Sequence, residues 1–328
     1  MDDKNYGLLI EKELSPFDWI AGGVSGAERS VLRENGDYSD LVPETEKQSN
    51  SSFDTMACVT FSALNCLETL ARFHGIRFNK SDRFTAKMSG TTKRGNYTSI
   101  VADTIRKDGT VDEVIWPFQR DKITDWDTYY QDIPQVVQSL GKKFLEDWEI
   151  TWEWVPVSRI REMLKYGPIQ VIVQAWPKPN AQGIYENKGE GSNYNHAVML
   201  YKGANAGDVY EIADHYDRDR KKLSPDYKFG SAVLFTLRKK QLETTPKPML
   251  ENNILVQNVE GNGAFGMHLN GKIMLGPNGD VLATVMMRSP RKTIDGVSYV
   301  LLRDPKPLKK ADWDALPKVN LKNEPINE

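Results

Sequence analysis

The chain has 328 residues, of which 39% are hydrophobic and 27% charged, and its formal net charge is −2. This composition is typical of a globular protein with one large or two modest domains, and the small net charge gives no electrostatic reason to expect nucleic acid or an anionic membrane as a partner. No run is apolar enough for a transmembrane helix, and the first residues lack the apolar core of a secretory signal.

Residues 1–43 are predicted to form an N-terminal arm laid over the main domain. The pair Gly22-Gly23 marks a turning stretch within this arm, and a polar loop follows it from Pro43 onward. The main domain is therefore expected to occupy residues 44–242.

The segment from Asp54 to Gly75 predicts a buried helix with a cysteine in its first turn. Asp54 is the expected N-cap, and Gly75 is the expected C′ residue. Apolar residues recur at helical spacing along it, namely Met56, Ala63, Leu67 and Leu70. Cys58 would lie where backbone N–H groups are unpaired and the helix dipole favours a thiolate, the nucleophilic form of cysteine. The alternative is that Cys58 is simply a small buried apolar residue.

Cys58 and Cys66 are the only cysteines of the chain. On one helix they would be about 12 Å apart, whereas a disulfide needs Cα atoms within about 7 Å. No intramolecular disulfide is expected, which suits a reducing compartment or a particle assembled in one. No Cys/His cluster has the spacing of a zinc site, and neither a metal nor a cofactor is predicted.

Helical and irregular segments are predicted to alternate between this helix and the middle of the chain. Residues 99–108 and 158–166 predict short helices that end at glycine. Residues 77–96 are polar and loop-like, and residues 120–154, rich in Trp, Tyr and Asp, are predicted to lie on the surface.

The second half of the main domain is predicted to be an antiparallel sheet. Four apolar runs separated by turn residues indicate strands over 169–175, 197–201, 209–213 and 232–237. A helical half followed by a stranded half is typical of an α+β fold, and the seam between the halves is the natural place for a site.

Residues 243–253 predict a linker, and residues 254–328 a small β-rich module with a tail. A hairpin turn is expected at Pro277-Asn278-Gly279-Asp280. This module is a candidate docking surface for a protein partner.

His196 and Asp214 are the residues that could support a cysteine nucleophile. His196 enters a predicted strand, and Asp214 ends the next one, so the two can meet on adjacent antiparallel strands. A catalytic cysteine needs a base, and the base needs a group to orient it. Each residue also has a non-catalytic alternative: His196 could be a structural residue, and Asp214 could be a turn residue.

Several features, in their order along the chain, resemble the papain-like cysteine peptidases. They are the cysteine helix (54–75), a helix and Trp-Pro-Phe motif (99–118), a helix, Gly-Pro and strand (163–173), a turn (183–185), and the histidine and aspartate motifs (195–198 and 212–214). The resemblance runs from about Pro43 to Leu237. It implies a helical half, with the cysteine helix at its centre, packed against an antiparallel β half. It also implies Cys58 as nucleophile, His196 as general base and acid, and Asp214 as orienting group.

The resemblance also implies an oxyanion hole formed by the Cys58 N–H and an upstream side-chain amide. Gln48 is the candidate, with Asn50 as the alternative, because Ser52 stands where the family usually has its glutamine. The tryptophan that often shields the histidine pair is absent after Asp214. No long charged helical pro-region precedes the domain, so inhibition by a pro-segment is not expected.

The sequence around Cys58 is similar to disulfide-free papain-like sequences carried in phage genomes, which implies a cytoplasmic or virion-associated protein. A peptidase acting on a polypeptide substrate is the predicted function. Two alternatives stay open, namely a non-catalytic structural protein on the same fold and a hydrolase of cell-wall peptide.

Overall fold

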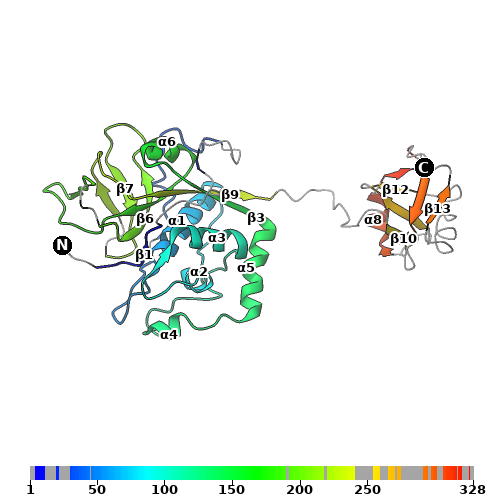
Figure 1. The fold of residues 1–328 in the computed structure, drawn as a ribbon, viewed down its shortest axis with the longest axis horizontal. Helices are drawn as coiled ribbons and strands as arrows, with labels where there is room; N and C mark the ends of the chain where they lie inside the picture. The colour runs from blue at the N-terminus through cyan, green and yellow to red at the C-terminus, as the bar shows by residue number, and fades with distance from the viewer. Residues whose placement is uncertain are drawn as a thin grey trace. The chain divides into compact units, whose positions relative to one another are not determined.

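The computed structural model describes most of the N-terminal part of the chain and several segments of the C-terminal part. The described residues are 4–11, 20–21, 30–44, 46–189, 191, 193–217 and 220–240, then 254–258, 265–269, 272–274, 291–294, 297–300, 306–315, 317–319 and 325. The chain divides into two compact units, Met1–Lys240 and Gln241–Glu328, which are described separately (Figure 1). Within the described part, no helix combines the length and apolar character that crossing a membrane requires.

The helical half of the N-terminal unit is built around α1 (Cys58–Phe73), which is buried from Cys58 to Ala71. The other helices are α2 (Asp82–Met88), α3 (Thr98–Asp108), α4 (Trp126–Tyr129) and α5 (Gln135–Asp147). Figure 1 shows α1 between the sheet and the other helices. The predicted central helix is therefore present, although it begins three residues later than an N-cap at Asp54 would give.

Of the two capping predictions for α1, the one for its C-terminal end is confirmed and the one for its N-terminal end is wrong. Gly75 is the C′ residue, as predicted, because its N–H bonds the Arg72 carbonyl and the next N–H, of Ile76, bonds the Ala71 carbonyl. The prediction that Asp54 is the N-cap is wrong: Ala57 holds that position without a side-chain bond. The Asp54 carboxylate accepts from the Met56 N–H instead, and so fixes the turn that leads into the helix.

The second half is a seven-stranded sheet in the order β3-β9-β4-β6-β7-β8-β5. The strands are β3 (Trp148–Trp154), β4 (Ile169–Val173), β5 (Ile184–Tyr185), β6 (His196–Lys202), β7 (Tyr210–Ala213), β8 (Arg220–Leu223) and β9 (Ala232–Lys239). All neighbours are antiparallel except β5 and β8. The four predicted strands and the α+β class are confirmed.

Apolar side chains fill both faces of this sheet. On one face, α1 contributes Leu64, Leu67 and Leu70 to a core shared with Met199 and Phe235. The other face packs on the short helical stretch formed by η1 (Val157–Arg159), α6 (Ile160–Met163) and η2 (Leu164–Tyr166). Burial on both faces explains why β4 and β6 are nearly continuous apolar runs.

Two segments contain helices or strands that the sequence analysis did not identify. Residues 120–154, expected on the surface, contain α5 and the edge strand β3, which pairs with β9 along its whole length. Trp148, Trp152 and Trp154 of β3 are buried, so their alternation was the signal of a strand. The stretch 77–96 contains α2, which is capped by the Ser81 side chain.

The described part of the C-terminal unit is mostly strand. A five-stranded sheet has the order β15-β10-β11-β12-β16, and β13 pairs with β14 in a separate hairpin. The elements are β10 (Ile254–Asn258), β11 (Phe265–Leu269), β12 (Lys272–Met274), β13 (Arg291–Ile294), β14 (Val297–Val300), β15 (Lys306–Leu308), α8 (Lys310–Ala315) and β16 (Lys318–Val319). The predicted linker, 243–253, and the predicted turn at Pro277–Asp280 lie outside the described residues.

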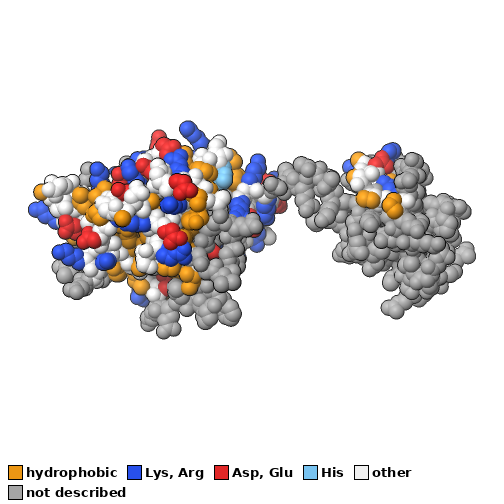
Figure 2. Space-filling view, turned by 90° about the horizontal axis from the view of Figure 1, so that it is seen from above, with side chains coloured by type: hydrophobic (Ala, Val, Ile, Leu, Met, Phe, Trp, Pro, Cys, Tyr) orange, Lys and Arg blue, Asp and Glu red, His pale blue; other side chains and the backbone are white. Residues whose placement is uncertain are grey.

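Charged side chains of both signs are interspersed on the face of the N-terminal unit shown in Figure 2. This mixture matches the formal net charge of −2 for the whole chain. Exposed ion pairs of this unit, such as Arg159 with Glu162, contribute little to stability.

Candidate active site

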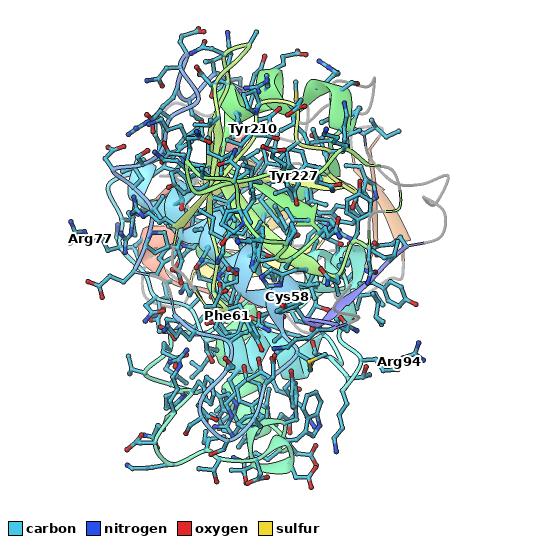
Figure 3. All side chains as sticks on the ribbon, turned by 90° about the vertical axis from the view of Figure 1, so that its left-hand side faces the viewer. Cys58, Phe61, Arg77, Arg94, Tyr210 and Tyr227 are labelled. Carbon is cyan, nitrogen blue, oxygen red and sulfur yellow. The ribbon has the colours of Figure 1, made fainter. Side chains whose placement is uncertain are left out.

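Cys58 is the first residue of α1, at the end of the helix that reaches β6. Figure 3 shows Cys58 and Phe61 on the first turn of this helix. The thiol is fully buried, and burial raises its pKa well above the usual range, opposed mainly by the backbone N–H of Ala197. In this structure, therefore, Cys58 is a neutral thiol beside the residue that follows His196.

His196 and Asp214 form a buried pair, as their positions on neighbouring strands predict. His196 opens β6, Asp214 follows β7, and the imidazole Nε2 lies 2.7 Å from the Asp214 Oδ1. The other ring nitrogen, Nδ1, is buried without a hydrogen-bond partner among the described residues. The carboxylate thus fixes the ring through Nε2 and leaves Nδ1 for a reacting group.

Asp214 stays ionised although it is buried. Burial alone pushes the pKa of this carboxyl upward, but His196 and Lys221 outweigh it and hold the pKa well below the usual range. The Asp214 Oδ2 forms an ion pair with the Lys221 ammonium group and accepts from the indole N–H of Trp176 at 3.0 Å. The Tyr216 backbone N–H donates to Oδ1 at 3.1 Å.

Trp176 supplies the shielding tryptophan that the sequence lacks after Asp214. Its ring meets the His196 ring edge-on, with centroids 6.0 Å apart. It comes from the segment after β4, and β4 pairs with β6 so that Val173 lies opposite His196. Sequence reasoning missed this residue, and the pairing of two predicted strands was the available signal.

Of the two candidates for the oxyanion-hole amide, only Gln48 lies at the site. Its side chain is fully buried, and its Nε2 donates to the Tyr6 carbonyl and to the Asp54 Oδ1, each at 3.0 Å. Asn50 donates instead to the carbonyls of Arg120 and Ile123. The Gln48 amide therefore already holds a peptide carbonyl, oriented by Asp54.

That carbonyl belongs to the N-terminal segment, which lies across the site. The Tyr6 N–H donates to the Asn195 carbonyl at 3.1 Å, and the Asn195 side chain donates to the Lys4 carbonyl at 2.8 Å. The Tyr6 ring lies 5.2 Å from the His196 ring and 4.6 Å from the Tyr216 ring. Tyr6 thus contacts the site at three places: its N–H bonds Asn195, its carbonyl accepts from Gln48, and its ring packs near His196.

The next residues of the segment fit against the loop before α1. Gly7 has φ of 105°, and a Cβ there would lie 2.3 Å from the Met56 carbonyl oxygen. Beyond it, β1 (Leu8–Leu9) pairs in parallel with β2 (Asn96–Tyr97). Residues 4–9, here called the covering segment, therefore lie across the predicted site. They are not the long charged helical pro-region whose absence the sequence analysis noted, and the expectation that no pro-segment inhibits the protein stays a prediction.

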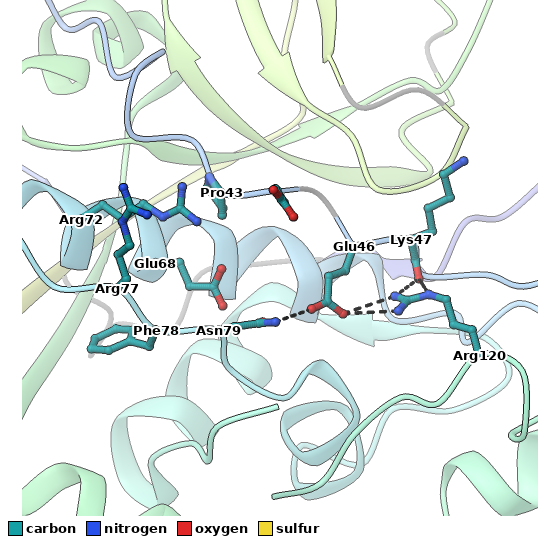
Figure 4. Close-up of a pocket in the computed structure, with 10 residues that line it drawn as sticks. Pro43, Glu46, Lys47, Glu68, Arg72, Arg77, Phe78, Asn79 and Arg120 are labelled. Carbon is teal, nitrogen blue, oxygen red and sulfur yellow. Dashed lines mark hydrogen bonds and ion pairs between the residues drawn. The ribbon is translucent and has the colours of Figure 1, made fainter. Parts of the chain in front are cut away.

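Another cavity, of about 580 Å³, opens at the other end of α1 (Figure 4). Glu68 and Arg72 of α1 line it, together with Glu46, which bonds Asn79 and Arg120. None of the predicted catalytic residues lines this cavity. Among the described residues, no group of His, Cys, Asp and Glu side chains is arranged to hold a metal ion.

Replacing Glu68 by glutamine should stabilise the protein increasingly as the pH rises from 5 to 8. Burial raises the pKa of Glu68 to about 8, whereas an unfolded glutamate titrates near about 4.3. Between these values the folded state binds more protons, so the wild type loses stability as the pH rises. Thermal melting at pH 5 and pH 8 measures this, with the exposed Glu146→Gln as control. An equal change in Tm at both values would contradict the assignment.

Comparison with solved structures places this architecture among papain-like folds. Xylellain, a cysteine protease from Xylella fastidiosa, superposes with a TM-score of 0.50 at 11% identity, over 72% of this chain and 97% of that one. Procathepsin L2 from the Tenebrio molitor larval midgut gives 0.46 at 13% identity, over 71% and 78%. Bromelain from Ananas comosus gives 0.42 at 17% identity, over 62% and 98%.

The sequence itself matches no protein-family model and no curated protein. Identities this low establish the fold and nothing finer. The N-terminal unit therefore has the papain-like α+β fold that the sequence predicts.

Proposed function

We propose that the N-terminal unit is a cysteine peptidase with Cys58 as nucleophile, His196 as general base and acid, and Asp214 as orienting group. One observation carries this proposal: the buried His196 ring is held at Nε2 by Asp214 at 2.7 Å, and its Nδ1 is left without a described partner. This ring lies on β6, the strand that the Cys58 end of α1 contacts. Its Nδ1 can therefore exchange a proton with a nucleophile.

In the proposed reaction, the Cys58 thiol first gives its proton to the His196 Nδ1, and the resulting thiolate attacks a peptide carbonyl carbon. The oxygen, now negative, accepts from the Cys58 N–H and the Gln48 amide. The C–N bond then breaks, His196 gives its proton to the leaving amine, and a thioester remains on Cys58. Neutral His196 next takes a proton from water as the water oxygen attacks the thioester. The C–S bond breaks, the acid is released, and protonated His196 returns the proton to the Cys58 sulfur.

A polypeptide is the proposed substrate, because the site already holds polypeptide backbone. The covering segment presents an N–H to the Asn195 carbonyl and a carbonyl to the Gln48 amide. An extended peptide can offer the same groups whatever its sequence, and side chains would then set selectivity. In the proposed enzyme, the covering segment therefore competes with the substrate.

Labelling with a peptidyl epoxide tests this proposal. Such a reagent should modify Cys58 once the covering segment is displaced, and should not modify it in His196→Ala. Cleavage of a peptide library, read by mass spectrometry, should follow the same pattern. Epoxide labelling no faster than labelling by an equally reactive electrophile without a peptide would count against a peptide-binding cleft.

The structural alternative keeps one specific observation in its favour. Cys58, His196 and Asp214 are all fully buried, and the Gln48 amide is already hydrogen-bonded. A protein that never displaces the covering segment would use the fold without turnover. Such a protein would stay unlabelled by the epoxide even when the segment is weakened.

A further inference from the structure

Lys221 has its charged end in the interior, next to the catalytic pair. It lies on β8, and its side chain is fully buried. The ammonium group forms ion pairs with Asp214 and with Asp217, and it lies 4.8 Å from the centre of the Trp176 ring. Lysine is seldom buried unless it is paired. The buried ammonium group of Lys221 therefore depends on its ion pair with Asp214.

The two oxygens of Asp214 serve two different cations. Oδ1 lies 2.7 Å from the His196 Nε2, and Oδ2 binds Lys221. A buried carboxylate with no other cation would strongly favour the protonated imidazole. In the acyl-enzyme, where the thiolate is gone, His196 would then remain charged at neutral pH, although the reaction with water requires the neutral ring.

We propose that Lys221 is a positioning residue that balances the charge of Asp214, so that the carboxylate orients His196 without keeping it protonated. The inference rests on the proposed function, since it assumes that His196 must both accept and release a proton. Lys221 and Asp214 together then carry no net charge, and the negative charge that Asp217 adds to the same ammonium group lies at a half-exposed side chain.

The other titratable groups around the pair do not provide this balance. Burial lowers the pKa of His215 to about 3, so it is neutral throughout the working range. Asp217 is half exposed and adds negative charge. Tyr6 and Tyr216 face the His196 ring. Lys4 belongs to the covering segment and bonds the Tyr216 hydroxyl. The buried Cys58 completes the set and is neutral here.

Proton NMR of the full chain tests the inference without needing turnover. The readout is the pH at which the His196 ring signal, assigned by its loss in His196→Ala, completes half of its change. Removing Lys221 leaves more negative charge, so Lys221→Met should move this transition up by about one pH unit, while Asp214→Asn should move it down by a similar amount. Lys222→Met, an exposed neighbour on β8, should leave it in place.

The double variant Asp214→Asn/Lys221→Met decides the matter even if Lys221→Met does not fold. It should return the transition to near the wild-type pH, about one unit above that of Asp214→Asn alone. Equal transitions in the double variant and in Asp214→Asn would overturn the inference and make Lys221 a structural residue. Absence of peptide cleavage, with the NMR shifts as stated, would overturn the proposed function while leaving the charge balance established.

Discussion

Replacing Gly7 by alanine should unseat the covering segment and expose Cys58. The new methyl group would lie 2.3 Å from the Met56 carbonyl, at a backbone φ of 105° that residues other than glycine disfavour. The Cys58 pKa should then fall, because burial is what raises it. Alkylation by iodoacetamide at pH 7 should become at least about 100-fold faster, since each unit of lowered pKa gives about ten times more thiolate.

Gly90→Ala is the matched control for this experiment. Gly90 also has positive φ, at 70°, but nothing lies within 4 Å of an added Cβ. It therefore carries the same kind of backbone strain without the clash. An equal rise in alkylation in both variants would mean that strain loosens the fold generally, and an unchanged rate in Gly7→Ala would show that the segment does not control access to Cys58.

Replacing Cys58 by alanine should abolish peptide cleavage, with a loss of at least about 10⁴-fold in kcat. Alanine has no nucleophilic atom that could form the acyl intermediate, so the reaction would have to proceed by direct attack of water. The measurement is best made in the Gly7→Ala background, where the site is open. Adding His196→Ala to Cys58→Ala should cost little more, because residues that act as a unit are not additive.

Cys66→Ala is the control for the loss of a thiol from the same helix. Cys66 is buried in the core that α1 shares with the sheet. Its removal should lower the melting temperature while leaving kcat within about twofold of the parent, as expected for a residue that only packs. Cleavage that survived Cys58→Ala would exclude the proposed nucleophile.

Local patterns predicted the elements that are apolar and clearly bounded. The helix ending at Gly75 and the strands β4 and β6 have continuous apolar runs with clear stops, and they formed as expected. Cys58 and Cys66 are both free thiols, as their spacing on one helix predicts. The edge strand β3 was missed because its tryptophans were interpreted by composition rather than by alternation.

The supporting residues of the site could not be found by spacing alone. Trp176 and Lys221 reach Asp214 from segments after β4 and in β8, and only the strand order brings them together. The covering segment was missed for a similar reason, since its contacts join Tyr6 to residues 42 and 189 positions away. Asp54 was assigned to a cap because its role in orienting Gln48 depends on the folded loop.

Some expectations stay predictions. The similarity to sequences in phage genomes, a location in the cytoplasm or a virion, and protein docking through residues 254–328 all rest on the sequence alone. The roles proposed for Cys58, His196, Asp214 and Gln48 rest on geometry, and the labelling and cleavage experiments test them.

The rate of Cys58 alkylation as a function of pH tests the central claim most directly. It should be measured from about pH 4 to 9 in Gly7→Ala, with and without His196→Ala, and with Cys66 as internal reference. We predict fast reaction that persists to about pH 5–6 and disappears without His196, as a thiolate–imidazolium pair requires. A rate that follows an ordinary thiol near about pH 8.5, indifferent to His196, would contradict the account and leave a papain-like fold without a reactive cysteine.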